Sequence, residues 1–174
     1  SYTYTSNLFM KLVIALVGRS NVGKSTLFNY LTKSRDALVA DQPGLTRDRI
    51  YGVTRRFQNR YIIIDTGGIT PVDSSKEKNQ INFAITSQAW FAIEEADIVF
   101  FLVDGAEGLV PQDQEVFSKI RNSNKNIFVL VNKADSNIEN MLASDFFVLG
   151  AKHVFEISAK SGKGVRTVIT EVEK

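Results

Sequence analysis

A glycine-bearing segment near the N-terminus has the residue types and spacing of a phosphate-binding loop. It runs Gly18-Arg19-Ser20-Asn21-Val22-Gly23-Lys24-Ser25 and matches the pattern G-x-x-x-x-G-K-[ST]. Its backbone N–H groups can face a polyphosphate, Lys24 can reach the β- and γ-phosphates, and Ser25 can coordinate Mg²⁺. A chance match in a chain of this length is expected in roughly one case in a hundred or fewer. The segment therefore predicts a nucleoside-triphosphate site.

A second polar segment, Asn132-Lys133-Ala134-Asp135, follows an apolar run and predicts which base is bound. The carboxylate of Asp135 can accept hydrogen bonds from the ring N1–H and the exocyclic amino group of guanine, whereas adenine lacks both donors. A buried site built for that pair rejects an analogue that leaves it unpaired. Asn132 can brace the base and neighbouring loops, and the stem of Lys133 can lie over the ring.

Near the C-terminus, Ser158-Ala159-Lys160 could direct backbone N–H groups at the guanine carbonyl. The triplet alone is weak, because an ordinary turn before a helix has the same composition.

Two further segments are candidate sensors of the γ-phosphate. In Asp65-Thr66-Gly67-Gly68, Asp65 is placed to hold Mg²⁺ through a water, and Gly68 can offer its N–H to the γ-phosphate. Thr46 is the best loop candidate for a second Mg²⁺ ligand. Two loops held by one phosphate and its metal would make a switch that is ordered with GTP and released after hydrolysis.

Composition excludes several other chemistries. Cysteine is absent, so a disulfide framework, a thiolate nucleophile and a cysteine zinc site are excluded. The single histidine, His153, makes a histidine metal site or a Ser-His-Asp hydrolase improbable, and we expect it to be structural. The net charge of +2 gives no argument for nucleic-acid binding. A basic stretch over residues 33–60 is either a solvated face or a surface for a phosphate-rich partner. No apolar run is long enough to span a bilayer.

The elements that must position these segments alternate along the chain. Apolar runs followed by helical patterns predict an α/β fold with a mostly parallel six-stranded sheet, one antiparallel edge strand and helices on both faces. Strands are expected at residues 11–17, 50–57, 60–65, 98–104, 127–132 and 153–157. Helices are expected at residues 24–32, 82–96, 111–122, 138–149 and from 165 onward. Residues 67–79 are expected to form a long loop, and Trp90 and Phe91 to lie in the core. Ligands bind such sheets at the carboxyl ends of the strands, where the polar segments stand.

Together these segments resemble the translation-factor-related GTPases, and within them the first G domain of the Era-like EngA (Der) family. Four segments carry the resemblance. They are the phosphate loop, Ser34-Arg35-Asp36-Ala37-Leu38-Val39-Ala40-Asp41-Gln42-Pro43-Gly44-Leu45-Thr46-Arg47-Asp48-Arg49, Asp65-Thr66-Gly67-Gly68 and Asn132-Lys133-Ala134-Asp135. It covers residues 10–174 and implies a P-loop G domain that binds GTP or GDP with Mg²⁺ and hydrolyses GTP. It also implies a cytoplasmic protein without membrane contact that acts on the large ribosomal subunit. Residues 1–9 are then expected to be an appended leader, with a short native strand as the alternative. The second G domain and KH-like domain of the family are not in this chain.

The resemblance also assigns residue roles. Nucleotide contacts are expected from Gly18, Ser20, Asn21, Val22, Gly23, Lys24, Ser25, Thr26, Asn132, Lys133, Asp135, Ser158, Ala159 and Lys160. Catalytic roles are expected for Lys24, Thr46, Gly68 and Asn21, and metal contacts for Ser25, Thr46, Asp65 (Mg²⁺) and Asn21 (K⁺).

One departure from the Ras-like pattern bears on catalysis. Ile69 stands where a water-orienting glutamine is often found, and enzymes similar to this family often use K⁺ instead, held partly by the asparagine that Asn21 matches. The alternative for Asn21 is that it only shapes the loop. Two other functions stay open: a regulatory guanine-nucleotide-binding module with negligible turnover, and a P-loop ATPase or kinase, against which Asp135 argues.

Overall fold

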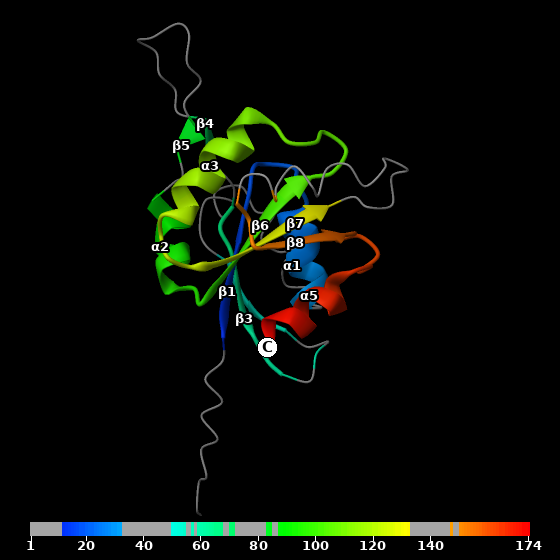
Figure 1. Cartoon of the computed structure of the whole chain (residues 1–174). Helices are drawn as coiled ribbons and strands as arrows, with labels where there is room; N and C mark the ends of the chain where they lie inside the picture. The colour runs from blue at the N-terminus through cyan, green and yellow to red at the C-terminus, as the bar shows by residue number, and fades with distance from the viewer. Residues whose placement is uncertain are drawn as a thin grey trace, which may run out of the picture.

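The computed structural model describes residues 12–32, 50–54, 57, 59–67, 70–71, 83–84, 87–132, 147 and 150–174. In this part of the chain one six-stranded sheet has the strand order β2-β3-β1-β6-β7-β8 (Figure 1). Its strands are β1 (Val13–Val17), β2 (Ile50–Val53), β3 (Ile62–Asp65), β6 (Ile98–Asp104), β7 (Asn126–Asn132) and β8 (His153–Ile157). All neighbouring pairs are parallel except β2 with β3, so the predicted parallel sheet with one antiparallel edge strand is confirmed.

Helices cover both faces of this sheet, which explains why its central strands are apolar throughout (Figure 1). On one face Ile14 and Leu16 pack with α1 (Lys24–Thr32) and α5 (Val165–Val172). On the other face Ala15 and Val17 pack with α2 (Ser87–Glu95) and α3 (Pro111–Arg121). Every residue of β6 is buried, because this strand lies in the middle of the sheet under both helix layers.

The segment before α2 differs from the prediction. The helix expected from residue 82 begins at Ser87, and Phe83–Ala84 (β5) instead pairs with Thr70–Pro71 (β4) in a separate antiparallel sheet. The prediction of a long loop over residues 67–79 was therefore wrong at residues 70–71, which form β4. The apolar spacing of this segment suits a helix, but pairing with a distant strand satisfies its backbone groups and overrides local propensity.

The hairpin of β2 and β3 is shorter than the expected strands. Beyond Val53, Thr54 still donates its backbone N–H to the carbonyl of Tyr61 at 2.9 Å. Its side-chain oxygen, rather than its carbonyl, accepts the N–H of Tyr61 at 2.9 Å, and this exchange ends the regular ladder.

Three other predictions can be compared with the described residues. His153 stacks on Phe128 with ring centroids 4.4 Å apart, which is a packing role. Trp90 packs against the core under α2 and α3, but Phe91 is 54% exposed, so its assignment to the core was wrong. The two neighbours differ because successive helical residues point about 100° apart. The predicted helix at 138–149 lies almost entirely outside the described residues, as does the leader boundary at Met10.

Within the described part of the chain, none of the helices has the length and apolarity needed to cross a bilayer.

Candidate functional site

The predicted phosphate loop joins the carboxyl end of β1 to the first residue of α1. Asn21 has a φ of 68°, a left-handed conformation that asparagine tolerates better than most residues. Gly23 also has a positive φ, and a Cβ there would overlap the amide of Asn132. Only glycine therefore allows the loop to pass so close to β7. The loop leads directly into the N-terminus of α1, and this arrangement favours phosphate binding.

Lys24 is buried within this loop, with only 6% of its surface exposed. Its Nζ donates to the carbonyl of Gly18 at 2.6 Å and to that of Arg19 at 3.1 Å. Burial lowers the pKa of Lys24 to about 8, while the neighbouring carboxylate of Asp65 opposes this shift. The ammonium group is thus desolvated, and Asp65 is its one anionic neighbour among the described residues, so an anionic phosphate at the loop would relieve an electrostatic cost.

The side chain of Asp65, at the end of β3, lies next to the start of α1. Ser25 donates its hydroxyl to Oδ2 of Asp65 at 3.4 Å, and the other carboxylate oxygen accepts the N–H of Gly67 at 3.2 Å. Thr66 is tied down by a 3.0 Å hydrogen bond from its hydroxyl to the carbonyl of Leu16. A hydroxyl oxygen and a carboxylate oxygen therefore lie side by side next to the phosphate loop.

This pair fits Mg²⁺, which binds one or two protein oxygens and completes its shell with water and substrate phosphates. Within the described ranges, no group of three or more His, Cys, Asp or Glu side chains could hold a metal ion. Two protein oxygens suit a metal whose remaining ligands come from water and a nucleotide.

Asn132 links the two halves of the predicted site. Its Nδ2 donates to the carbonyl of Val22 at 2.8 Å, and its Oδ1 accepts the backbone N–H of Ala159 at 2.9 Å. Its own carbonyl accepts the N–H of Gly105 at 2.7 Å. Because Asn132 is only 4% exposed, these hydrogen bonds form away from water. One buried amide therefore holds the phosphate loop and the loop after β8 in register.

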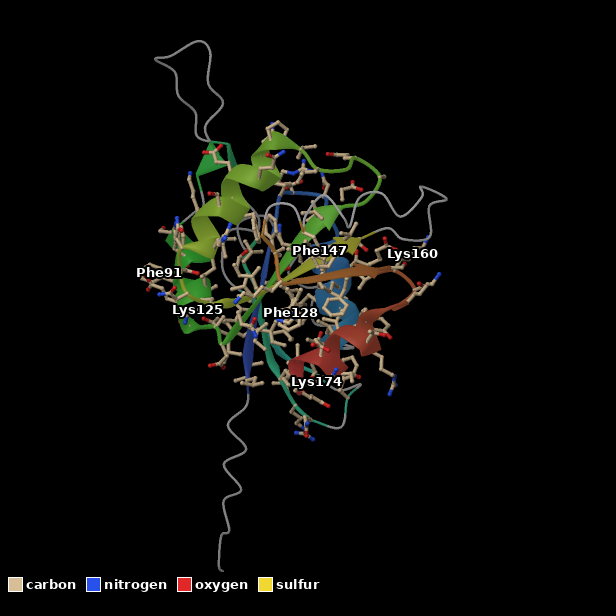
Figure 2. All side chains as sticks on the ribbon, viewed as in Figure 1. Phe91, Lys125, Phe128, Phe147, Lys160 and Lys174 are labelled. Atoms are coloured by element: carbon tan, nitrogen blue, oxygen red, sulfur yellow. The ribbon has the colours of Figure 1, made fainter. Side chains whose placement is uncertain are left out.

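Apart from Asp65 and Asn132, described above, the predicted site residues fall into three groups. Those in the phosphate loop and at the start of α1 lie together, and they are Gly18, Ser20, Asn21, Val22, Gly23, Lys24, Ser25 and Thr26. Asn132 brings Ser158, Ala159 and Lys160 toward them, with Lys160 exposed on the loop after β8 (Figure 2). Thr46, Gly68, Lys133 and Asp135 lie outside the described residues.

The sequence analysis missed an ion pair that anchors the phosphate loop to α3. Nε of Arg19 lies 2.8 Å from Oδ1 of Asp113, whose side chain is fully buried, and a second Arg19 nitrogen lies 2.9 Å from the exposed Glu107. Burial raises the pKa of Asp113, and Arg19 acts in the opposite direction. Arg19 occupies an unspecified position of the loop pattern and Asp113 lies 94 residues away, so no local signal in the sequence pointed to this pair.

One protein family and several curated proteins match this chain in sequence. The family described as "50S ribosome-binding GTPase" matches residues 13–133. The chain is 52% identical to GTPase Der of Marinomonas sp. (strain MWYL1) over 92% of its own length and 35% of that protein's. It is also 52% identical to GTPase Der of Burkholderia mallei (strain NCTC 10229), over 93% of its length and 36% of the relative's. The chain thus spans about a third of the length of these curated relatives.

Solved structures resemble it as well. Era of Aquifex aeolicus bound to GDP·AlF4⁻ superposes with a TM-score of 0.76 at 28% identity, over 92% of this chain and 55% of that one. Era in complex with MgGDPNP and a segment of 16S ribosomal RNA gives a TM-score of 0.75 at 29% identity, with the same coverage. The G domain of FeoB from Methanococcus jannaschii, at 21% identity and a TM-score of 0.67, shares the fold over 94% of this chain and 96% of that one.

Proposed function

This chain belongs to the family of 50S ribosome-binding GTPases, and from that premise we propose that it binds GTP and GDP where β1, β3, β7 and β8 end, and hydrolyses GTP as a molecular switch. The observation that carries the proposal is the desolvated Lys24 ammonium inside the phosphate loop, beside Asp65 and Ser25. A buried cation with one anionic neighbour favours a ligand that brings further negative charge.

The phosphate half of the site would work by positioning and charge. Lys24 exchanges its bonds to two loop carbonyls for bonds to the β- and γ-phosphates, and the loop N–H groups cradle the same oxygens. Ser25 and Asp65 would hold Mg²⁺, which when bound supplies positive charge next to the phosphates. Thr46 and Gly68 are proposed to contact the metal and the γ-phosphate.

The base half of the site would read guanine. Asp135 accepts the two guanine donors and Lys133 covers the ring. In Ser158-Ala159-Lys160 the N–H of Lys160 meets the guanine carbonyl, because the N–H groups of Ser158 and Ala159 donate within the protein. The support for this arrangement is Asn132, whose two side-chain hydrogen bonds join this loop to the phosphate loop. Competition of GTP and ATP for one labelled nucleotide tests the proposal, and equal competition by ATP would overturn it.

The identity of the base-reading residue has its own test. In the variant Asp135→Asn, an amide replaces the carboxylate and can donate to the additional carbonyl of xanthine. We expect preference to move from GTP toward xanthosine triphosphate. Retained GTP preference would contradict the assignment of Asp135.

Catalysis is proposed to be slow and to depend on K⁺. Ile69 cannot orient water by hydrogen bonding, so the intrinsic rate is expected near the Ras-type value of about 10⁻⁴ s⁻¹. The side chain of Asn21 is exposed on the phosphate loop, and its amide oxygen suits a K⁺ that would supply the charge of an arginine finger. Turnover in matched KCl and NaCl tests this, and equal rates would refute it.

A role on the large ribosomal subunit is proposed from the family to which the chain belongs. The test is GTP turnover and co-sedimentation with large subunits in K⁺ buffer, with small subunits as the control. Binding and stimulation by large subunits alone support it, and no effect of either subunit on this chain counts against it. The cytoplasmic location stays a prediction.

The second candidate is a regulatory guanine-nucleotide-binding module with negligible turnover, and the apolar Ile69 favours it. The same turnover measurement separates the two functions. Tight GDP binding without measurable hydrolysis in K⁺, with or without subunits, would select the regulatory module.

A further inference from the structure

The loop after β8 closes on itself before α5 begins. Ser158 donates its N–H to the carbonyl of Lys163 at 2.9 Å, and its carbonyl accepts the N–H of Gly162 at 2.7 Å. The Ser158 hydroxyl oxygen also lies 3.3 Å from the N–H of Ser161, which donates to it. Ser158 and Ala159 are buried, whereas Lys160 is exposed. The loop is therefore a compact unit whose placement depends on what touches it from outside.

Two of the contacts that hold this unit come from distant elements. The first is the hydrogen bond from the N–H of Ala159 to Asn132. The second is the ring of Tyr30, which lies so close to Gly162 that a Cβ on that glycine would overlap ring carbons and the hydroxyl oxygen. Gly162 has a φ of 82°, so a side chain there would be disfavoured by the backbone as well. Glycine at this position lets the Tyr30 ring pack directly on the loop.

Tyr30 lies on α1, the helix whose first residue is Lys24. A rise of 1.5 Å per residue puts Tyr30 about 9 Å along the helix from Lys24. The ring also packs against the core cluster that contains Phe28, Leu31 and Val165, which restrains its orientation. The same rigid helix that points its N-terminus at the phosphate loop thus carries the side chain that abuts the loop after β8.

We propose that Tyr30 is a positioning residue for guanine recognition: by packing on Gly162 it sets where the N–H of Lys160 stands relative to the base. This inference rests on the proposed function, in which that N–H meets the guanine carbonyl. Hydrogen bonds weaken steeply with misalignment, so a shift of the loop reduces binding of that carbonyl and leaves the phosphate contacts intact.

The test compares two ligands, GDP and 6-thioguanosine 5′-diphosphate, which keeps the phosphates, the ring N1–H and the amino group but has sulfur, a weak acceptor, in place of the carbonyl oxygen. For the unchanged chain we expect GDP to bind more tightly. In Tyr30→Ala the GDP affinity should fall about fivefold to tenfold, the worth of one neutral hydrogen bond. Affinity for the analogue should stay nearly constant, so the ratio of the two affinities falls toward one.

Two further variants serve as controls. Tyr30→Phe keeps the ring and should keep the ratio. Phe91→Ala removes an aromatic ring that is 54% exposed on α2, far along the chain from this loop, and should leave both affinities unchanged. Figure 2 shows Phe91 on the α2 side of the molecule, away from Lys160. A merely structural role for Tyr30 would lower both affinities together.

The outcomes separate the inference from the proposed function. If the unchanged chain does not distinguish GDP from the analogue, the proposed base contact fails and the inference fails with it. If it does distinguish them and Tyr30→Ala keeps the full ratio, only the inference is overturned. Should Tyr30→Ala not fold, Gly162→Ala with Tyr30 intact is measured instead. The inference then expects the same loss of ratio, and an unchanged ratio overturns it.

Discussion

The two loops that face each other across the proposed nucleotide site are supported in different ways. In the phosphate loop, Lys24 bonds the carbonyls of Gly18 and Arg19 and the chain continues directly into α1, while Asn132 and Asp113 add contacts from β7 and α3. The loop after β8 is placed by Asn132, 27 residues before Ala159, and by Tyr30 on the first helix.

This difference explains why one loop has a strong sequence signature and the other a weak one. The residues that wrap the phosphate loop and supply its charge are consecutive, so its pattern is visible in the sequence. A loop that is placed from a distance can have ordinary composition, because its geometry is imposed by side chains elsewhere. Variants remote from the second loop should therefore change base recognition, whereas those that damage the first should change phosphate binding.

The largest effect is expected for Lys24→Met. Affinity for GDP and GTP should fall about 100-fold or more, because several charge-assisted hydrogen bonds to phosphate are lost, each worth about 1.5–3 kcal/mol. The melting temperature without nucleotide should change little, because keeping a desolvated ammonium charged costs about 3 kcal/mol and offsets the lost bonds to two carbonyls. Calorimetric titration and thermal unfolding measure the two quantities. A large fall in melting temperature would show that Lys24 is a structural brace instead.

Asn132→Ala should affect both loops at once. It leaves the carbonyl of Val22 and the N–H of Ala159 without their buried partner, at a cost of about 2–3 kcal/mol in unfolding free energy. Denaturant unfolding measures this loss, and nucleotide affinity should fall in parallel. Asn126→Ala, at the exposed start of the same strand, is the matched control and should change stability by less than about 0.5 kcal/mol. Equal effects of the two variants would contradict the role of Asn132 as the link between the loops.

Asp113→Ala tests whether the phosphate loop also depends on a distant contact. Removal of the buried carboxylate leaves Arg19 without its principal partner. Because the Arg19 side chain is 19% exposed, we expect a loss of about 1–2 kcal/mol rather than the full cost of a broken buried pair. Nucleotide affinity should fall severalfold, with the GDP-to-analogue ratio unchanged. Glu107→Ala, which removes a 53% exposed partner of Arg19, should be nearly neutral. A changed GDP-to-analogue ratio in Asp113→Ala would contradict the expectation that phosphate binding and base recognition depend on different loops.

The smallest effect is a pH dependence that belongs to the phosphate loop alone. The pKa of Lys24 is lowered to about 8 in the free protein, and a bound phosphate raises it. Below about pH 8 the lysine is charged in both states, so affinity is flat. Above about pH 8 binding takes up a proton, so GDP affinity should fall by at most tenfold per pH unit. In Lys24→Arg, the side chain stays charged and this dependence should vanish. Identical pH profiles for the two proteins would contradict a lowered lysine pKa.

Much of the fold could be predicted because its elements carry strong local patterns. The bounds of α1, β6 and β8 agree with the prediction, since each combines an apolar pattern with a clear end signal such as the glycine turn before Lys24. The start of α2 could not be predicted, because the pairing of Phe83–Ala84 with Thr70–Pro71 depends on a partner outside the local window. The exposure of Phe91 was missed because the direction of its helix face depends on where α2 docks.

The candidate site also has a part that the sequence predicts and a part that depends on tertiary packing. The sequence alone determined the phosphate loop and its placement between a buried strand and a helix, because backbone wrapping and charge there depend on consecutive residues such as Gly23-Lys24-Ser25. Only the tertiary structure decided that Arg19 pairs with Asp113, that Asn132 bonds both loops, and that Tyr30 packs on Gly162. These contacts join residues far apart along the chain, and their geometry exists only after the helices have packed on the two faces of the sheet. The spacing of neighbouring residues determines which groups a loop offers to a ligand, whereas packing of the helices and sheet determines the position of the loop.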